Sequence, residues 1–331
     1  MRVLLLGGTS FVGRAIVEET LRAGAEVTVF TRGKTGAGLF PGVPRLAGDR
    51  DAADYASLRT AATWDAVVDT SGYLPRHVGQ AMDVLGDRVG RYVFMSSHAV
   101  YRIEGTGPGS TEDAPRRAPV RDVRETGDLT DATYGPSKVA CEDDVTARYG
   151  ERATIVRPGK VAGPYDNQGG LTYYVRRAAR GGKLALPGDP EQPVQLIDSR
   201  DLARLVGRLI SDDRAGAFNA VGPEPPVTLG GLIGTCARVA GTEAEIVRVP
   251  PEAAPGFFPL VRPRSAWDTQ RRSPARARAA GMPATPLERT AADVLAWDRD
   301  RGEPPLSGGF SPAQEAALLA AGAGARKGLP L

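Results

Sequence analysis

The start of the chain constrains its fold more than any other segment. Residues 3–6, VLLL, form a short apolar run that suits a buried strand and is too short for a signal peptide. Gly7 and Gly8 end the run, and apolar residues recur at helical spacing through residues 11–17. A strand, a glycine turn and a helix in this order direct backbone N–H groups and a helix N-terminus toward a phosphate. We therefore expect the chain to begin with a phosphate-binding turn.

Short apolar runs alternate with helical patterns through the first half of the chain. This alternation predicts an α/β fold with a Rossmann-type, doubly wound parallel sheet. We expect strands at 27–30, 45–47, 66–69, 92–95 and 153–156 after the first one, and helices near 11–23, 75–86 and 135–148.

The character of the sequence changes after about residue 160, where Gly, Pro and Arg become frequent. With 331 residues the chain is long enough for two lobes. We expect a dinucleotide-binding domain over 1–164 and a smaller, mostly helical substrate lobe over 165–331. The elements expected after residue 160 are helices at 171–181, 200–211, 229–240 and 286–300, short strands at 195–197, 217–220 and 245–249, and a last helix from Ser311.

Composition excludes several classes of protein. The net charge is only +3, and the arginines between 262 and 278 are expected to form a solvated face, so we expect no nucleic-acid partner. Cys141 and Cys236 lie far apart, which predicts a reduced, cytoplasmic chain. His77 and His98 are the only histidines and are too few for a zinc site, so no metal is expected. No apolar run approaches the roughly 20 residues of a membrane span.

The glycine turn is spaced as G-x-x-G-x-x-G, with Ser10 in the middle position. Gly7 permits the tight turn, and Gly13 lets the helix approach the strand closely. The turn residues expected to bind the cofactor are Gly7, Thr9, Ser10, Phe11, Val12 and Gly13.

The residues after the second strand bear on the choice between NAD and NADP. Thr31 and Arg32 stand where an NAD site has an acid for the ribose hydroxyls. Arg32 can pair with a 2′-phosphate, which favours NADP, or stack on the adenine of NAD. Asp49, in "GDRD", is expected either to bond the adenine amine or to cap the next helix.

Tyr134 and Lys138 form a Y-x-x-x-K pattern, "YGPSK". Residues four positions apart share one helix face, so both side chains are expected at one place. A neighbouring ammonium would lower the pKa of the phenol and let it act as a base.

These motifs together resemble the short-chain dehydrogenase/reductase superfamily, in its extended branch of epimerases, dehydratases and related reductases. The resemblance rests on Gly7, Gly13, Ser97, Tyr134 and Lys138, on "RPGKVAGP" at 157–164 and on "QLIDSRDLA" at 195–203. It implies that Tyr134 is the general acid or base, that Lys138 binds the nicotinamide ribose, and that Ser97 bonds the reacting oxygen. It further places Ser71, Pro158 and Val161 at the cofactor. A homodimer is also implied, built on the helix with Tyr134 and the helix before it, with apolar contacts from Val78, Met82, Leu85, Val139 and Val145.

Two residues depart from that branch. Lys160 stands where nucleotide-sugar epimerases often have Asn, so it either contacts the substrate or faces solvent. His98 stands where sugar dehydratases have an Asp that protonates a leaving hydroxyl. A histidine can supply such a proton near pH 7, or it can be a polar wall residue with no role in proton transfer.

Three functions are consistent with these residues. The first is an NAD(P)-dependent epimerase/dehydratase-like enzyme that acts by hydride transfer on a hydroxyl or carbonyl of a sugar, nucleotide sugar or nucleoside. The second is an NADPH-dependent ketone reductase of secondary metabolism. The third is a non-catalytic nucleotide- or RNA-binding protein of the same fold, which the retained Tyr134 and Lys138 disfavour.

Overall fold

The computed structural model describes residues 1–59 and 62–325, and the chain forms two compact units. Unit 1 comprises residues 1–161, 199–221 and 272–283. Unit 2 comprises residues 162–198, 222–271 and the chain from residue 284 onward. The first segment of unit 1 ends close to the domain boundary expected after residue 164. Two later segments, however, return to unit 1.

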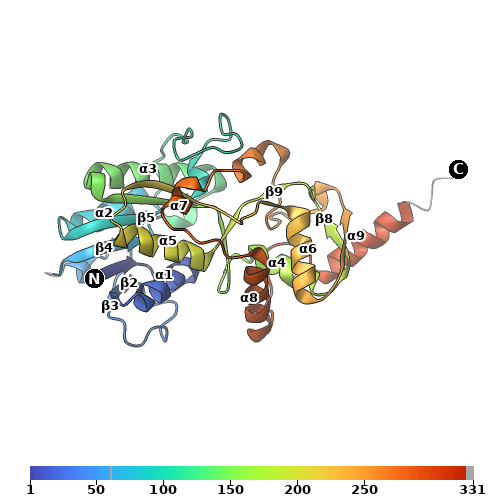
Figure 1. The fold of residues 1–331 in the computed structure, drawn as a ribbon, viewed down its shortest axis with the longest axis horizontal. Coiled ribbons are helices and arrows are strands. Elements are labelled where there is room, and N and C mark those ends of the chain that lie inside the picture. The colour runs from blue at the N-terminus through green and yellow to red at the C-terminus, as the bar shows by residue number, and fades with distance from the viewer. Residues whose placement is uncertain (60–61, 326–331) are drawn as a thin grey trace. The chain divides into compact units, whose positions relative to one another are not determined.

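Unit 1 is built on a seven-stranded sheet in the order β11-β6-β5-β4-β1-β2-β3. Every strand pair in it is parallel, which confirms the predicted doubly wound fold (Figure 1). Its strands are β1 (Arg2–Leu6), β2 (Glu26–Thr31), β3 (Arg45–Ala47), β4 (Trp64–Asp69), β5 (Val89–Met95), β6 (Ala153–Pro158) and β11 (Gly216–Ala220). The last of these was expected only as a short strand of the second lobe.

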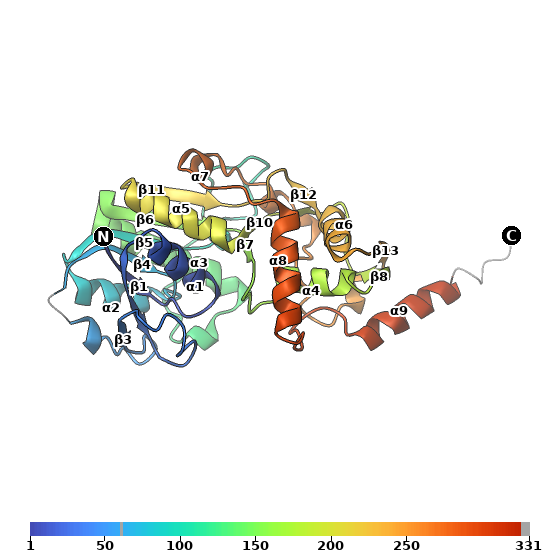
Figure 2. The same ribbon diagram turned by 60° about the horizontal axis from the view of Figure 1, so that its bottom comes forward.

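Helices cover both faces of this sheet. The helices α1 (Phe11–Arg22) and α5 (Ser199–Ser211) pack on one face, and α2 (Pro75–Leu85) and α3 (Asp131–Tyr149) on the other (Figures 1 and 2). The strand residues of β1 and β4 between the two layers are almost fully buried, which explains their continuous apolar sequence. At the start of α3, Thr130 and Thr133 cap each other's backbone amides.

The apolar residues expected at a dimer contact lie instead in the core of unit 1. Val78, Met82 and Leu85 of α2 are buried, as are Val139 and Val145 of α3. Because these side chains already pack within one chain, they present no apolar surface to a second copy. That part of the dimer prediction is wrong.

Unit 2 is smaller and mostly helical, as expected. Its core lies among α4 (Gly170–Ala178), α6 (Leu229–Ala240) and α8 (Leu287–Asp300), with the parallel strand pair β8 (Gly182–Leu186) and β13 (Ala244–Arg248) beside them. The last helix, α9 (Pro312–Ala325), directly follows Ser311, whose hydroxyl accepts from the amide of Gln314 at 3.3 Å. Among the described residues, no helix is long and apolar enough to cross a membrane.

Candidate functional site

The glycine turn has the geometry that a dinucleotide phosphate requires. Gly7 has φ +115°, and a Cβ there would lie 2.3 Å from Thr70 Oγ1. A Cβ on Gly13 would lie 2.7 Å from the backbone nitrogen of Gly8, so only glycine allows the helix to approach this closely. Ser10, the N-cap residue of α1, makes no side-chain capping bond to the helix. The first amides of α1 are therefore without a side-chain cap, and the turn fits a bound pyrophosphate.

The end of β4 lies against this turn. The hydroxyls of Thr70 and Ser71 both donate to the carbonyl of Leu6, at 3.1 and 2.9 Å. Ser71, expected at the cofactor, is therefore placed directly beside the glycine turn. Thr9 lies on the other side, with its hydroxyl 2.9 Å from that of Thr35. Phe11 and Val12 are half-buried in the first turn of α1.

Two cations follow β2, each near a carboxylate. Arg32 Nη1 lies 4.0 Å from Asp51 Oδ2, and Lys34 Nζ lies 3.7 Å from Asp49 Oδ2. The Thr31 hydroxyl accepts from the amide of Gly33 at 3.0 Å, so it stabilises the local turn. Asp49 Oδ1 likewise accepts from the amide of Asp51 at 3.1 Å. The Asp49 carboxylate therefore stabilises a turn, and it does not cap the next helix, η1 (Ala56–Leu58), whose N-cap residue is Tyr55.

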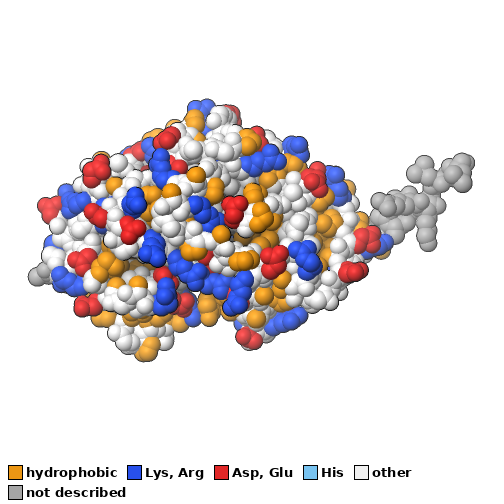
Figure 3. Space-filling view, viewed as in Figure 1, with side chains coloured by type: hydrophobic (Ala, Val, Ile, Leu, Met, Phe, Trp, Pro, Cys, Tyr) orange, Lys and Arg blue, Asp and Glu red, His pale blue; other side chains and the backbone are white. Residues whose placement is uncertain are grey.

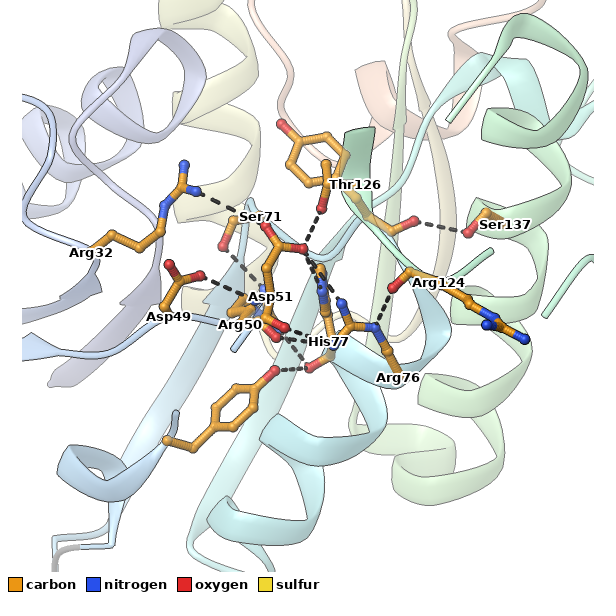
Figure 4. Close-up of polar contacts among 12 residues, drawn as sticks. Arg32, Asp49, Arg50, Asp51, Ser71, Arg76, His77, Arg124, Thr126 and Ser137 are labelled. Atoms are coloured by element: carbon orange, nitrogen blue, oxygen red, sulfur yellow. Dashed lines mark hydrogen bonds and ion pairs between the residues drawn. The ribbon is translucent and has the colours of Figure 1, made fainter. Parts of the chain in front are cut away.

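Arg50 and Asp69 form a buried ion pair at this edge of the sheet, and Figure 4 shows Arg50 with its contact to Ser71. Arg50 donates to both carboxylate oxygens of Asp69, at 2.6 and 2.8 Å, and also to the Ser71 hydroxyl at 3.0 Å. The Tyr92 hydroxyl donates to Asp69 Oδ2 at 2.8 Å. Burial acts to raise the pKa of Asp69, but the Arg50 charge and these hydrogen bonds outweigh it, so the pKa is lowered. Asp69 is therefore ionised, and it holds Ser71 in place through Arg50.

Asp51 connects this edge to α2 and to the loop before α3 (Figure 4). It accepts from the Thr126 hydroxyl at 2.9 Å and lies 3.5 Å from Arg76 and 3.2 Å from His77 Nε2. Burial, with Arg50 and Arg76, lowers the pKa of His77 to about 4, so its ring is neutral at pH 7. Arg76 also donates to the carbonyl of Arg124 at 2.8 Å.

Ser97 and Tyr134 meet at the end of β5. The Ser97 hydroxyl accepts from the amide of Ala99 at 3.1 Å. Burial raises the pKa of Tyr134, and the neighbouring Ser97 hydroxyl opposes that rise. The expected lowering of this pKa by Lys138 is not what the structure shows. Tyr134 therefore keeps its proton near neutral pH.

Lys138 lies on the same helix but is bonded to main-chain carbonyls. Its Nζ donates to Gly72 O at 2.7 Å and to Met95 O at 2.9 Å, and it lies over the ring of Phe94. The side chain is buried, and burial lowers its pKa. The ammonium is thus fixed between the ends of β4 and β5, where a cofactor ribose is expected to lie.

His98 follows Ser97 and contacts a residue from late in the sequence. Its Nδ1 lies 3.2 Å from Arg272 Nη1, although the two residues are 174 positions apart. Arg272 is only 3% exposed, and its guanidinium lies 4.8 Å from the centre of the Tyr101 ring. The expectation that all the arginines between 262 and 278 form a solvated face is therefore wrong for Arg272.

The remaining predicted residues follow β6. Pro158 is the last residue of that strand and is buried. Lys160 and Val161 are half-buried and belong to β7 (Lys160–Ala162). Arg157, before Pro158, donates to both carboxylate oxygens of Glu142 in α3, at 2.9 and 2.7 Å, and to Tyr101 Oη at 2.8 Å.

Three buried charged residues near the site, Arg50, Asp69 and Arg272, were not predicted as site residues from the sequence. A charged residue that ends an apolar run, such as Asp69 in "AVVD", signals that a buried strand end needs a partner. The sequence does not identify Arg50 as that partner, because Arg59 and Arg76 are closer to Asp69 along the chain. No local pattern identifies Arg272, because its neighbours His98 and Tyr101 come from the other end of the sequence.

Comparison with known proteins places the chain among relatives of varied function. It is 28% identical over 270 residues to the chloroplast stem-loop binding protein of 41 kDa b from Arabidopsis thaliana, covering 76% of this chain. It is 28% identical over 223 residues to the 2'-dehydrokanamycin reductase of Streptomyces kanamyceticus, covering 65% of this chain. The chain spans 66% and 59% of the lengths of these two relatives.

Solved structures show the same fold. The UDP-glucose 4-epimerase of Thermus thermophilus, solved in complex with NAD, superposes with a TM-score of 0.67 over 90% of this chain and 99% of that chain, at 21% identity. The family model for NAD dependent epimerases and dehydratases matches residues 52–221, a segment that contains Ser97, Tyr134 and Lys138. Because this match spans half of the chain, and because the fold and the glycine turn agree with it, the protein belongs to the NAD dependent epimerase/dehydratase family.

Proposed function

We propose that this protein transfers hydride between a nicotinamide cofactor and a hydroxyl or carbonyl carbon of a sugar-like molecule, in an epimerase/dehydratase-like reaction. The observation that carries the proposal is that Ser97 lies close enough to Tyr134 at the end of β5 to lower the pKa of the phenol, while the buried ammonium of Lys138 donates to Met95 O at the end of the same strand. Doubly wound sheets bind their ligands at this edge.

The cofactor, when bound, accepts or supplies the hydride. The residues proposed to hold it are those of the glycine turn, from Gly7 to Gly13, with Thr31, Arg32 and Asp49 at the adenosine end and Ser71, Lys138, Pro158 and Val161 toward the nicotinamide. Tyr134 moves a proton to or from the reacting oxygen, and Ser97 holds that oxygen by a hydrogen bond. Lys160 is proposed as a substrate contact.

Net reduction of a ketone is the second candidate. Tyr134 is protonated in this structure, which suits donation of a proton to a carbonyl oxygen as it becomes a hydroxyl. One relative is named a reductase. The two candidates differ in cofactor use, because an epimerase returns the hydride and a reductase consumes it. Purified protein that carries bound oxidised cofactor and needs none added supports epimerisation, whereas stoichiometric loss of added NADPH supports reduction.

A preference for NADP over NAD is proposed from Arg32 and Lys34. Their side chains are 53% and 68% exposed, and their ion pairs with Asp51 and Asp49 are long, so these pairs contribute little and can be exchanged for a 2′-phosphate. We expect Arg32→Ala to weaken NADP binding by about 1.5–3 kcal/mol and to leave NAD binding nearly unchanged. Calorimetric titration of both cofactors measures this. Tighter binding of NAD by the wild type, with no effect of Arg32→Ala, would contradict the preference.

Lys138→Met is expected to weaken binding of either cofactor by about tenfold or more, since an ammonium hydrogen bond contributes about 1.5–3 kcal/mol. The same change leaves the carbonyls of Gly72 and Met95 without this donor, so thermal unfolding is measured alongside the titration. A variant that stays folded and binds the cofactor as tightly as the wild type removes the proposed ribose contact.

Nucleic-acid binding is a further candidate because one relative is named a stem-loop binding protein. Exposed arginines do occur on α5, at Arg204 and Arg208, and Figure 3 shows blue side chains over α1 and α5, mixed with acidic ones. Binding of an RNA stem-loop that weakens steeply with salt would support this function.

The homodimer and the cytoplasmic location stay predictions. Light scattering at micromolar concentration tests whether the protein is a dimer.

A further inference from the structure

The pair of His98 and Arg272 lies next to Ser97 and has no role in the function proposed above. His98 is half-buried in the short helix η2 (His98–Val100), directly after Ser97. Arg272 Nη1 lies 3.2 Å from His98 Nδ1. Both residues belong to unit 1, so their relative placement is part of one compact body.

The position of Arg272 is set by several neighbours. Its guanidinium lies over the Tyr101 ring at 4.8 Å, and Tyr101 Oη donates to Asn219 Oδ1 at 2.7 Å. The next residue, Ser273, donates its amide to Ser110 O at 2.9 Å and accepts from Asn219 Nδ2 at 3.4 Å. The guanidinium is therefore held beside His98 by its contact with the Tyr101 ring and by the backbone hydrogen bonds of the next residue, Ser273.

Arg272 is charged at neutral pH despite its burial. Burial is the main cause that lowers its pKa, to about 10, and the charge of Arg157 adds to the lowering while Tyr101 opposes it. Near neutral pH the side chain therefore presents a positive charge and hydrogen-bond donors to the imidazole.

The chemistry of the two groups decides how they bond. A guanidinium has N–H donors and no acceptor, so His98 Nδ1 must be the acceptor. The hydrogen of the ring is then on Nε2, and the ring is neutral. A ring protonated on both nitrogens would direct its Nδ1–H at a donor and would place two positive charges within 3.2 Å.

Several charged and titratable side chains lie around η2. They include Arg272, Arg157 of β6, Arg117, Tyr101, and Tyr134 of α3. The nearby carboxylate of Glu142 accepts from Arg157, Arg116 and Ser96. Glu112 accepts from the amide of Asn219 at 2.7 Å.

We propose that Arg272 is a positioning residue that keeps His98 neutral, with its hydrogen on Nε2. This inference rests on the proposed function and narrows it. In that site a neutral His98 donates a hydrogen bond to a substrate oxygen, and it does not protonate a leaving hydroxyl. The reaction that fits is hydride transfer at a carbinol or carbonyl carbon without loss of water, so the substrate class is a hydroxylated ketone or alcohol that keeps all its oxygens.

Histidine NMR of the full-length protein tests this without a substrate. The chain has two histidines, and His98→Asn removes one signal and thereby assigns both. Long-range proton–nitrogen spectra distinguish a ring nitrogen that carries hydrogen from one that does not. We expect hydrogen on Nε2 alone from about pH 8 to about pH 5.5, a range in which an exposed histidine becomes protonated.

Two variants separate charge from packing. Arg272→Gln removes the charge, so the His98 signal is expected to move with pH inside that range. Arg272→Lys keeps a charged donor, so the signal is expected to stay fixed as in the wild type. If loss of packing on Tyr101 were the cause, both variants would behave alike.

The proposal is overturned if wild-type His98 becomes protonated on both nitrogens within that range, or if its hydrogen is on Nδ1. The wild-type spectrum alone gives this answer, even where Arg272→Gln fails to fold. Failure of the proposed function is seen separately, as an absence of hydride transfer in wild type that is independent of the His98 spectrum.

Discussion

Tyr134→Phe is expected to lower turnover by about 10²–10⁴-fold and to leave cofactor affinity unchanged. The substitution removes only the hydroxyl, whose pKa Ser97 lowers, and the ring still fills the same space. Proton transfer to or from the reacting oxygen then has no positioned partner. Single-turnover hydride transfer, followed by the absorbance of the reduced nicotinamide, measures the loss. Calorimetric titration of the cofactor measures the binding that should remain.

A matched control exists on the same helix. Tyr149→Phe removes a hydroxyl about four turns from Tyr134, where it makes only a 3.5 Å contact with Gly86 O. This control should turn over at the wild-type rate. Turnover by Tyr134→Phe within a few-fold of that control would remove Tyr134 from the mechanism and, with it, the argument from the end of β5.

Asp69→Ala is expected to destabilise the protein by about 3–5 kcal/mol, because it leaves the buried Arg50 charge without its carboxylate. Arg50 is 7% exposed and Asp69 is fully buried, so water does not replace the lost partner. The Tyr92 hydroxyl and the amide of Ser71 lose an acceptor as well. Urea unfolding followed by circular dichroism measures the change in the free energy of unfolding.

Asp51→Ala provides the comparison, since it removes a carboxylate from the same edge of the sheet. Asp51 is 39% exposed, and its ion pairs with Arg76 and Arg32 are 3.5 and 4.0 Å long. We expect a loss of about 1 kcal/mol or less from such solvent-screened pairs. Similar losses for Asp51→Ala and Asp69→Ala would contradict the assignment of Arg50–Asp69 as the buried anchor of this edge.

The buried Arg50–Asp69 pair also predicts how the stability of the protein changes with pH. The pKa of Asp69 is lowered in the folded state, so its stabilising contribution is complete above the ordinary carboxyl pKa of about 4 and is lost as the pH falls below it. Asp69→Asn has no such ionisation, so its unfolding free energy should fall less steeply than that of the wild type over that acidic range.

Local sequence patterns predicted the sheet of unit 1 well. The strand at 45–47 and the helix at 229–240 have the predicted bounds, and the other strands of that sheet lie within two or three residues of theirs. The reason is that a buried parallel strand requires a continuous apolar run and a helix requires apolar residues at its own spacing, and both requirements are visible within a few residues. The glycine turn was predictable for a similar reason, because the positive φ of Gly7 and the close approach of Gly13 to the backbone of Gly8 both favour glycine.

Long-range contacts were not predictable in this way. Val78 and Val139 were expected at a dimer contact, yet they pack inside the unit, because an apolar helix face does not specify what covers it. Lys138 was expected to lower the pKa of Tyr134. Instead its ammonium is bonded to the carbonyls of Gly72 and Met95, and burial dominates the titration of the phenol.

Local patterns in the sequence were enough to predict the order of the candidate functional groups along the chain: a phosphate turn at the start, Ser97 after the fifth strand, and Tyr134 and Lys138 on one helix face. The charges and partners of the side chains around them depend on the tertiary structure. Arg50 neutralises Asp69, and Arg272 reaches His98 across 174 positions. The physical reason is that secondary structure depends on neighbours in sequence, whereas burial and charge pairing depend on neighbours in space, which the folding of distant segments brings together.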